Sequence, residues 1–521
     1  MEVERDIRAE GGNAILTVII CASAGVVAGL SLAWPFSGVL PAGKPVWLGS
    51  LLSIALLYVL VQAASTIKQA LAQGAIFSTV WLASSIWWLF VAMYQYGGLN
   101  APTALAAVGL LSFVLGLYYT CALGLFWTWK ASLGIWSPFV FSALWTGAET
   151  ARGTWLSGFG WGAVGYAQVD GPLSVLAPWI GAYGIGAVVA MLSAALFEKS
   201  WNRYLRVGLL PAVLFLPIAV PSAVTTWTQP TGKLQLALLQ GNIPQDEKFE
   251  QGTGIPLALH WYREQILASQ TQLTIAPETA IPLLPAQLPP GYWGAIDKKF
   301  SDTKHALLLG IPLGDMSLGY TNSVLGLQGD APAWRYNKHH LVPFGEFIPP
   351  MFRWFTQLMH IPLGDFESGA LNQGTFDVFG QKLGTTICYE DLFGEELAVR
   401  FRDDATAPNI LVNVSNIGWF GDTVAIDQHL HISRMRTLEF ERPFVRSTNT
   451  GATAIIDHRG IVVSELARHT RGVLLGVTEG RSGVTPYAWW VSRFGLWPLW
   501  MFVLLVSVWA WRRNKLAVVQ A

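Results

Sequence analysis

The stretch Thr386-Ile387-Cys388-Tyr389-Glu390-Asp391 places a single thiol directly after an apolar run that begins near residue 384. Such a run predicts a buried strand over 384–388. A cysteine at the end of a strand is held by the sheet and can still meet a substrate. Cys388 is the only cysteine after Cys121. The soluble part of the chain therefore cannot form an internal disulfide, and this thiol can stay reduced in an oxidising compartment.

Two charged residues follow apolar runs upstream of the thiol. Ala276-Pro277-Glu278-Thr279-Ala280 supplies a carboxylate, and Tyr336-Asn337-Lys338-His339-His340 supplies a lysine. A thiol attacks a carbonyl carbon only after it loses its proton. We expect Glu278 to take that proton, because apolar flanks raise the pKa of a carboxyl group. Lys338 and the N–H of Tyr389 are expected to bind the negative oxygen that forms.

The composition is that of a membrane protein with a soluble part. Of 521 residues, 52% are hydrophobic and 13% are charged, whereas soluble domains carry about 25% charged residues. A transmembrane helix needs roughly 20 apolar residues. Eight runs are candidate spans, at 14–34, 46–64, 75–96, 102–127, 137–151, 175–197, 207–223 and 493–511. The fifth is the weakest candidate, because Glu149 and Arg152 lie near its end. The net charge of zero gives no reason to expect a nucleic-acid partner.

Lysine and arginine are divided unevenly between the loops that join these runs. With a cytoplasmic N-terminus, the segments on the same side hold Arg5, Arg8, Lys68, Lys130, Lys199, Arg203, Arg206, Arg512, Arg513 and Lys515. The short loops on the other side hold only Lys44 and Arg152. Because basic loops stay in the cytoplasm, both termini are predicted to be cytoplasmic and the soluble part to lie outside.

The chain divides into three predicted regions. A seven-helix transmembrane domain covers 1–228, a soluble catalytic domain covers 229–485, and a last transmembrane helix with a short tail covers 486–521. Within the soluble domain, strands are expected at 234–240, 273–276, 306–311, 323–327, 384–388, 409–414, 444–447, 453–456 and 473–477, and helices at 255–270 and 423–441. This alternation favours a layered α/β sandwich.

The segment 343–375 is unusually apolar for a soluble domain. It is too short to span a bilayer and too apolar to extend freely into water. Two interpretations fit the pattern. The segment can be a lid or arm that dips into the membrane surface, or an ordinary helix packed against the domain.

Taken together, these motifs resemble those of a known enzyme superfamily. Glu278 in APETA, Lys338 in YNKHHLVPFGE and Cys388 in GTTICYED resemble the Glu-Lys-Cys triad of the nitrilase superfamily. The eight predicted spans and the PFGEFIP stretch narrow the resemblance to the bacterial apolipoprotein N-acyltransferases. Further stretches that resemble this family lie at 239–245, 412–416, 418–421, 434–436 and 446–449.

The resemblance implies a nitrilase-like αββα sandwich carried on eight transmembrane helices. It implies a ping-pong reaction in which Cys388 attacks the sn-1 ester of phosphatidylethanolamine and forms a thioester. The N-terminal amine of a diacylglyceryl-cysteine in an apolipoprotein then takes the acyl chain. Glu278 is general base and then acid, and Lys338 stabilises the intermediates. No cofactor is implied. The protein is expected to be a monomer in the bacterial inner membrane, with a periplasmic catalytic domain.

The same resemblance implies a set of residues that line the site: Glu346, Tyr389, Glu390, Trp419, Phe420 and Phe249. Glu346 can orient Lys338 or receive the incoming ammonium group, but it can also cap a turn. Trp419 and Phe420 can shape an acyl pocket or simply pack. Phe249 stands where the family often has tryptophan, so a ring is kept and an indole N–H is lost.

Two other classes of function stay open at this point. A membrane-anchored hydrolase would use the same three residues, with water as the second substrate. A transporter or scaffold would need a polar path through the membrane, and Glu149, near the end of the fifth run, is the one clear acid there. The pair His429 and His431 lies on different faces of a helix, so no metal site is expected.

Overall fold

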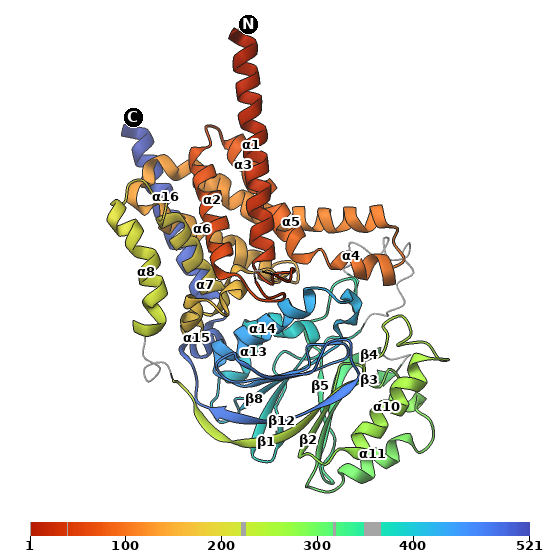
Figure 1. The fold of residues 1–521 in the computed structure, drawn as a ribbon. Helices are drawn as coiled ribbons and strands as arrows, with labels where there is room; N and C mark the ends of the chain where they lie inside the picture. Colours follow the sequence, from red (N-terminus) through yellow and green to blue (C-terminus); the bar gives the residue numbers. More distant parts are fainter. Residues whose placement is uncertain (1, 39, 220–225, 316–318, 349–365, 521) are drawn as a thin grey trace. The chain divides into compact units, whose positions relative to one another are not determined.

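The computed structural model describes residues 2–38, 40–219, 226–315, 319–348 and 366–520. The chain forms two compact units (Figure 1). The first consists of Met1–Phe90, Ala101–Val224 and Leu496–Ala521, and the second of Val91–Asn100 and Thr225–Gly495.

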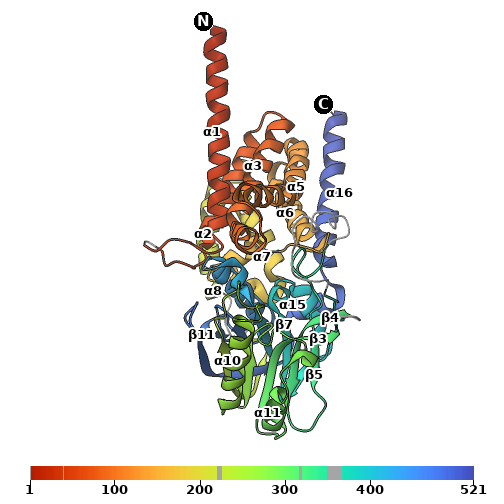
Figure 2. The same ribbon diagram turned by 90° about the vertical axis from the view of Figure 1, so that its right-hand side faces the viewer.

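In the part of the chain that the structure describes, the first unit is built from α-helices. These are α1 (Glu2–Leu30), α2 (Trp47–Ala63), α3 (Ile67–Ile86), α4 (Leu89–Val91), α5 (Ala101–Leu133), α6 (Ser137–Thr154), α7 (Ala177–Ala195), α8 (Arg203–Ala219) and α16 (Trp497–Gln520). Helix α1 packs on α2 and α3, whereas α16 packs on α5 and α6. The two terminal helices accordingly stand apart in Figure 2.

Among the described residues, length and composition single out helices that could cross a membrane. Two stretches qualify outright, Ala101–Thr154 and Pro172–Ala195. The number rises to four if each of two bent helix pairs forms one span. One of these pairs breaks the predicted 75–96 span, because α3 ends at Ile86 and the chain bends by 64° before it continues. The predicted total of eight spans is not established by these criteria.

Apolar side chains face outward on the long helices. Leu105 and Leu110 on α5 are 66% and 64% exposed, which suits a surface that contacts lipid. The two charged residues near the end of α6 are buried instead. Glu149 accepts a hydrogen bond from the N–H of Val164 at 2.8 Å, and Arg152 donates to the carbonyl oxygen of Trp161 at 2.6 Å. Both side chains therefore brace the loop after α6, which is a structural role.

The second unit contains two six-stranded sheets. In the first, the order β12-β1-β2-β3-β4-β5 joins Gly472–Ser482, Gln229–Gln240, Leu273–Ala276, Ala306–Asp315, Gly319–Leu327 and Trp334–Asn337. In the second, the order β11-β10-β9-β8-β7-β6 joins Val462–Glu465, Ala454–Ile456, Phe444–Thr448, Ile410–Ser415, Gln381–Ile387 and Phe376–Val378. Strands β1, β2 and β3 are parallel, as are β7, β8 and β9. Each sheet thus has a parallel centre with antiparallel strands at its edges.

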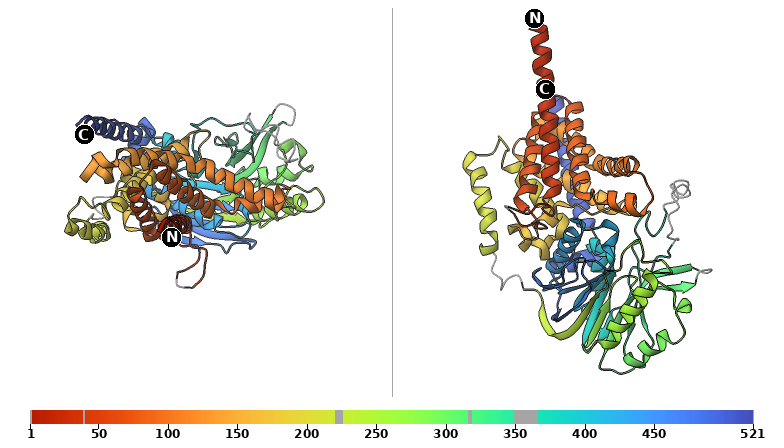
Figure 3. Two further views of the ribbon diagram at one scale, coloured as in Figure 1. Left: turned by 90° about the horizontal axis from the view of Figure 1, so that it is seen from above. Right: turned by 45° about the vertical axis from the view of Figure 1, so that its right-hand side comes forward.

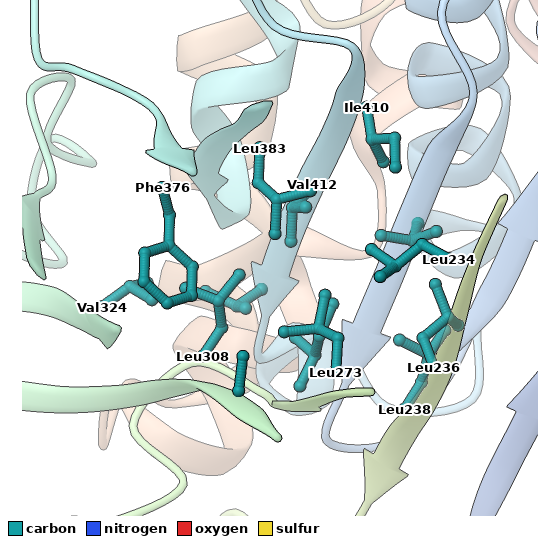
Figure 4. Packing of buried hydrophobic residues seen from close by; sticks show 14 of the residues in the cluster. Leu234, Leu236, Leu238, Leu273, Leu308, Val324, Phe376, Leu383, Ile410 and Val412 are labelled. Carbon is teal, nitrogen blue, oxygen red and sulfur yellow. The ribbon is translucent and has the colours of Figure 1, made fainter. Parts of the chain in front are cut away.

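The two sheets pack face to face through one apolar core. Figure 4 shows side chains of Leu236 and Leu273 from the first sheet beside Leu383 and Val412 from the second. The central strands are continuous runs of leucine, isoleucine and valine because both of their faces are covered. Each such side chain contributes roughly 1.5–3 kcal/mol when fully buried.

Helices cover the outer faces and complete an αββα sandwich. Helices α10 (Gly254–Ala268) and α11 (Tyr292–Phe300) pack on the first sheet, and the right-hand view of Figure 3 shows these green helices together on one side of the strands. Helix α14 (Ala425–Phe440) packs on the second sheet. The predicted layered fold is confirmed. Strands β5, β6 and β11 and helix α11 were not predicted, because they are short and lie at the periphery.

Ten residues that connect the helices α4 and α5 belong to the second unit. They include the π-helical turn η1 (Ala92–Tyr96). The ring of Tyr96 meets the ring of Trp419 edge-on, with 5.6 Å between their centroids. A segment far upstream in the sequence therefore packs on the loop that follows β8. The proposed lid at 343–375 cannot be assessed in the same way, since residues 349–365 lie outside the described part of the chain.

Candidate active site

The three residues expected to act on the substrate lie at the carboxyl ends of strands. Glu278 follows β2, Lys338 follows β5 and Cys388 follows β7. In sheets with a parallel centre, ligands bind at this end of the strands. The structure brings the three side chains together: Lys338 Nζ lies 3.4 Å from Glu278 Oε1, and the charges of both act on the Cys388 thiol.

The backbone turns sharply at the thiol. The φ angle of Cys388 is 52°, a left-handed value that costs a residue with a Cβ about 1–2 kcal/mol. Strand β7 ends at Ile387, and the short helix η7 (Cys388–Leu392) begins at the cysteine. The strand predicted over 384–388 therefore begins three residues too late and ends one residue too late. The turn places the thiol at the rim of the core between the sheets, where it is only partly buried.

A buried polar cluster behind the nucleophile fixes this turn. Asn413 Nδ2 donates to the carbonyl oxygen of Cys388 at 3.0 Å, and His429 Nε2 lies 3.3 Å from the same oxygen. Arg446 Nη2 donates to Nδ1 of the imidazole at 3.1 Å, so the imidazole proton is on Nε2. That Nε2 also lies 2.8 Å from Asp391 Oδ1. His429 therefore helps to hold the backbone carbonyl group of Cys388 in position.

The carboxylate of Glu278 is held by three donors. Asn322 Nδ2 donates to Oε1 at 2.7 Å, the N–H of Asn416 donates to Oε2 at 2.8 Å, and the Lys338 ammonium lies beside Oε1. Burial by itself raises the pKa of Glu278, but the charge of Lys338 and the bond from Asn322 outweigh burial, and the net pKa is lowered. The expectation of a raised pKa was wrong, because a cation and hydrogen-bond donors from distant parts of the sequence outweigh the effect of burial.

Glu346 is the second carboxylate partner of the lysine. Its Oε1 lies 2.9 Å from Lys338 Nζ and accepts from Asn322 Nδ2 at 2.8 Å. Its Oε2 accepts from the N–H of Val342 at 2.8 Å. Glu346 therefore both orients Lys338 and caps a turn. Burial lowers the pKa of Lys338, but the charges of Glu346 and Glu278 outweigh this effect and raise it, so the ammonium stays charged.

The two residues that follow the cysteine are turned into the fold. The ring of Tyr389 packs edge-on against Phe393 with 5.1 Å between centroids. The carboxylate of Glu390 accepts from the N–H of Ile387 at 2.6 Å and from the N–H of His339 at 2.7 Å. Glu390 thus ties the strand that carries the thiol to the loop that carries Lys338. Burial raises its pKa.

The three aromatic residues expected to line the site lie in two loops. Trp419 and Phe420 are in the short helix η9 (Ile417–Phe420) after β8, and both are half-buried. Phe249 is in the loop after β1, is 44% exposed, and its ring centroid lies 6.0 Å from Lys248 Nζ. The role of these three rings in binding an acyl chain stays a prediction.

The thiol is protonated at rest. Burial and the nearby charge of Glu278 raise the pKa of Cys388 to about 12, although Lys338 and the Ser415 hydroxyl act in the opposite direction. A free thiolate is therefore scarce at neutral pH. Attack on a carbonyl carbon must therefore be coupled to transfer of the thiol proton to a neighbouring base. The charge of Glu278 acts on the thiol, and the lowered pKa of Glu278 keeps this carboxylate ionised.

Several residues of the site were not predicted to take part. Asn322, Lys248 and Arg446 were given no role, although each is buried and polar. A signal was present for Asn416, because polar residues end the apolar runs of the parallel strands one after another. No sequence signal marks Asn322, which lies inside β4 and acts across the sheet.

Comparison with known proteins places both units in described families. Residues 16–195 match the apolipoprotein N-acyltransferase N-terminal domain, and residues 235–477 match the carbon-nitrogen hydrolase family. An apolipoprotein N-acyltransferase of Verminephrobacter eiseniae is 50% identical, over 95% of this chain and 96% of its own. One from Ralstonia nicotianae is 42% identical over 85% of each chain. The crystal structure of a CN-hydrolase superfamily protein from Xanthomonas campestris aligns with a TM-score of 0.35 at 18% identity, over 51% of this chain and 96% of that one.

Proposed function

The chain belongs to the apolipoprotein N-acyltransferase family, and we propose that Cys388 carries the acyl group that it transfers. The protein is an N-acyltransferase that acts in the final acyl-transfer step of lipoprotein maturation. The proposal concerns the residues that perform the transfer, the acyl donor and the arrangement in the membrane.

In the first half-reaction, the donor is a phospholipid, phosphatidylethanolamine, with its sn-1 ester at the thiol. Cys388 Sγ bonds to the ester carbonyl carbon while Glu278 receives the thiol proton. The carbonyl oxygen becomes negative and is stabilised by Lys338, with the N–H of Tyr389 as a second donor. Collapse of this intermediate breaks the ester C–O bond. Glu278 returns the proton to the leaving oxygen, which yields a lysophospholipid and a thioester.

In the second half-reaction, the acceptor is the α-amine of a diacylglyceryl-cysteine at the apolipoprotein N-terminus. The neutral amine bonds to the thioester carbonyl carbon, and Glu278 takes a proton from the nitrogen. The C–S bond then breaks and Cys388 leaves as a thiolate, which recovers a proton from Glu278. The amide product and the resting thiol are the result.

One observation carries this assignment. Lys338 lies between two carboxylates, at 3.4 Å from Glu278 and 2.9 Å from Glu346. The ammonium is therefore fixed in position before any substrate arrives, and it needs no reorganisation to stabilise an oxyanion. The thiol beside it stands on a strained turn at a strand end, which is a usual place for a nucleophile.

The decisive experiment follows the acyl group. The purified full chain is incubated with phosphatidylethanolamine, and peptides are analysed by mass spectrometry. We expect an added acyl mass on the peptide that contains Cys388, and its loss when a diacylated lipopeptide is supplied. An acyl mass that persists in Cys388→Ala refutes the assignment. Discharge by water alone, with no lipopeptide product, favours the hydrolase alternative.

We also propose eight spans, with both termini in the cytoplasm and residues 229–485 on the periplasmic side of the inner membrane. The uneven distribution of basic residues between the loops supports this arrangement, as do the apolar side chains exposed on the long helices. The enzyme is proposed to work as a monomer, because one chain holds every residue of the reaction. Light scattering in detergent tests this, and a dimer mass contradicts it.

The topology is tested by labelling. In a background with Cys21, Cys121 and Cys388 replaced by alanine, single cysteines are introduced by Asp330→Cys and Arg512→Cys, both at exposed positions. A membrane-impermeant maleimide added to spheroplasts is expected to label the first and not the second. Labelling of both, or of the second alone, contradicts the arrangement.

A further inference from the structure

A second lysine is buried beside the catalytic carboxylate. Lys248 lies in the loop after β1 and is 2% exposed. Its Nζ donates to the carbonyl oxygen of Glu278 at 3.1 Å. Two lysines therefore contact the same residue, Lys338 at the carboxylate and Lys248 at the backbone.

The loop that carries this lysine is closely packed. A Cβ atom on Gly254, at the start of α10, would lie 2.1 Å from the carbonyl oxygen of Glu247 and 2.9 Å from the backbone nitrogen of Lys248. Only glycine lets the helix approach this closely. The backbone of Lys248 is thereby held close to the start of α10.

A buried lysine that only stabilised the fold would have a paired charge and several hydrogen-bond acceptors around its ammonium group. A buried ammonium is unfavourable unless its charge is paired and its three N–H donors are satisfied. Among the described residues, the ammonium of Lys248 makes a single hydrogen bond, and the acceptor is a neutral carbonyl. The negative groups that act on it are Glu278 and Cys388. The negative groups that compensate the charge of Lys248 are thus the two groups that exchange a proton in the proposed reaction.

The charges around the thiol show what this lysine supplies. Glu278 and Glu346 both disfavour a thiolate at Cys388, and both are paired with the one ammonium of Lys338. When the thiol gives its proton to Glu278, the negative charge moves from the carboxylate to the sulfur within the same buried volume, away from the position where Lys338 pairs with it. A second ammonium offsets that charge directly.

Building on the triad proposed above, we infer that Lys248 is a positioning residue of the acyl-transfer site that fixes the backbone of Glu278 and stabilises the Cys388 thiolate by its charge. Burial lowers the pKa of Lys248 to about 8, even though Glu278 and Cys388 act to raise it. The ammonium is therefore charged at neutral pH and loses its proton under mildly alkaline conditions.

The test measures alkylation of Cys388 by iodoacetamide over a pH series, with the modified peptide quantified by mass spectrometry in the full chain. Lys248→Gln keeps a donor for the Glu278 carbonyl but removes the charge, and Lys248→Arg keeps the charge. Lys233→Gln is the matched control, since Lys233 is exposed on β1. At a fixed pH below about 8, where Lys248 of the parent chain is charged, we expect Lys248→Gln to be alkylated about tenfold more slowly, which corresponds to a thiol pKa raised by about one unit. Below about pH 8, where Lys248 of the parent chain is charged, Lys248→Arg and the control are expected to stay near the parent profile.

A Lys248→Gln profile that coincides with the parent profile overturns the inference, because the hydrogen bond alone would then suffice. If Lys248→Gln does not fold, the acylation rate of the parent chain decides instead. That rate is expected to fall above about pH 8 in the parent chain and to persist in Lys248→Arg, whose guanidinium stays charged. Equal decline in both chains contradicts the inference. Neither outcome bears on the triad, which fails only if Cys388→Ala retains the acyl-enzyme.

Discussion

Asn322 offers the sharpest test of how the two carboxylates are held. Its side-chain nitrogen donates to Glu278 at 2.7 Å and to Glu346 at 2.8 Å, and it is 6% exposed. Asn322→Leu keeps the branched shape of the side chain and removes both bonds. A hydrogen bond to a charged group contributes about 1.5–3 kcal/mol. The expected loss of folding free energy is therefore about 3–6 kcal/mol, a large part of the roughly 5–15 kcal/mol of a typical protein.

The same substitution is expected to change the pH dependence of acylation. The bond from Asn322 favours the ionised form of Glu278 and lowers its pKa. Without that bond the pKa rises, and the base becomes active only at higher pH. A loss of about 1.5–3 kcal/mol corresponds to a shift of about one to two pH units. The pKa of Glu278 is lower in the folded chain than in the unfolded chain. The bond from Asn322 therefore stabilises the fold fully above about pH 4.3, the ordinary pKa of glutamate. This contribution is lost as the pH falls through the pKa that Glu278 has in the folded chain.

The assay is the rate of acyl-enzyme formation from phosphatidylethanolamine between pH 4.5 and 8, together with thermal unfolding at each pH. Asn409→Leu is the control, because Asn409 is also buried in this unit. Its side chain accepts a hydrogen bond from the N–H of Lys382 at 3.0 Å and donates one to the carbonyl oxygen of Arg481 at 3.1 Å, and both of these partners are neutral backbone groups. Both variants are expected to lose stability, but only Asn322→Leu is expected to shift the acid limb of the rate. If the two variants shift it equally, the bridging amide does not set the pKa of the base.

Three further substitutions test other parts of the site. Lys338→Met is expected to slow acylation by about a hundredfold or more, as loss of an oxyanion donor does. The same substitution is expected to raise the pKa of Glu278. Burst kinetics like those of the parent chain would contradict the proposed role of Lys338. Gly310→Ala would place a Cβ 2.8 Å from Glu278 Cα and is expected to destabilise the fold by about 1–3 kcal/mol, whereas Gly294→Ala, with open space around it, is expected to be neutral or stabilising in the same melting experiment. His429→Leu removes the imidazole behind the nucleophile and is expected to lower the acylation rate more than the affinity for lipid; a change in KM alone speaks against its role.

Much of the fold was predictable because local pattern and long-range structure agree. The apolar runs that end at Glu278 and Cys388 are the central strands β2 and β7, which are buried on both faces and therefore leave an unbroken hydrophobic signal. Strand β11 alternates between exposed and half-buried residues over four positions, too few to establish a period of two.

The electrostatics of the site could not be predicted from sequence neighbours. The pKa of Glu278 depends on Lys338, Asn322 and Asn416, which come from separate strands and loops. The residues adjacent to Glu278 in sequence suggest an apolar site and a raised pKa, which is the wrong direction. The burial of Lys248 is hidden for the same reason, since a lysine between acidic residues in a loop looks like a solvated charge.

The packing of Tyr96 on Trp419 has a consequence for how the protein is made. The ribosome completes the turn that carries Tyr96 long before it reaches β8, so this turn has no partner while the intervening helices and the strands β1 to β7 are synthesised. A gene fragment that encodes only residues 225–495 would leave the aromatic face of Trp419 uncovered. Anyone who wishes to express the catalytic unit as a separate polypeptide must therefore supply residues 91–100 as well, for example by grafting them onto one of its termini.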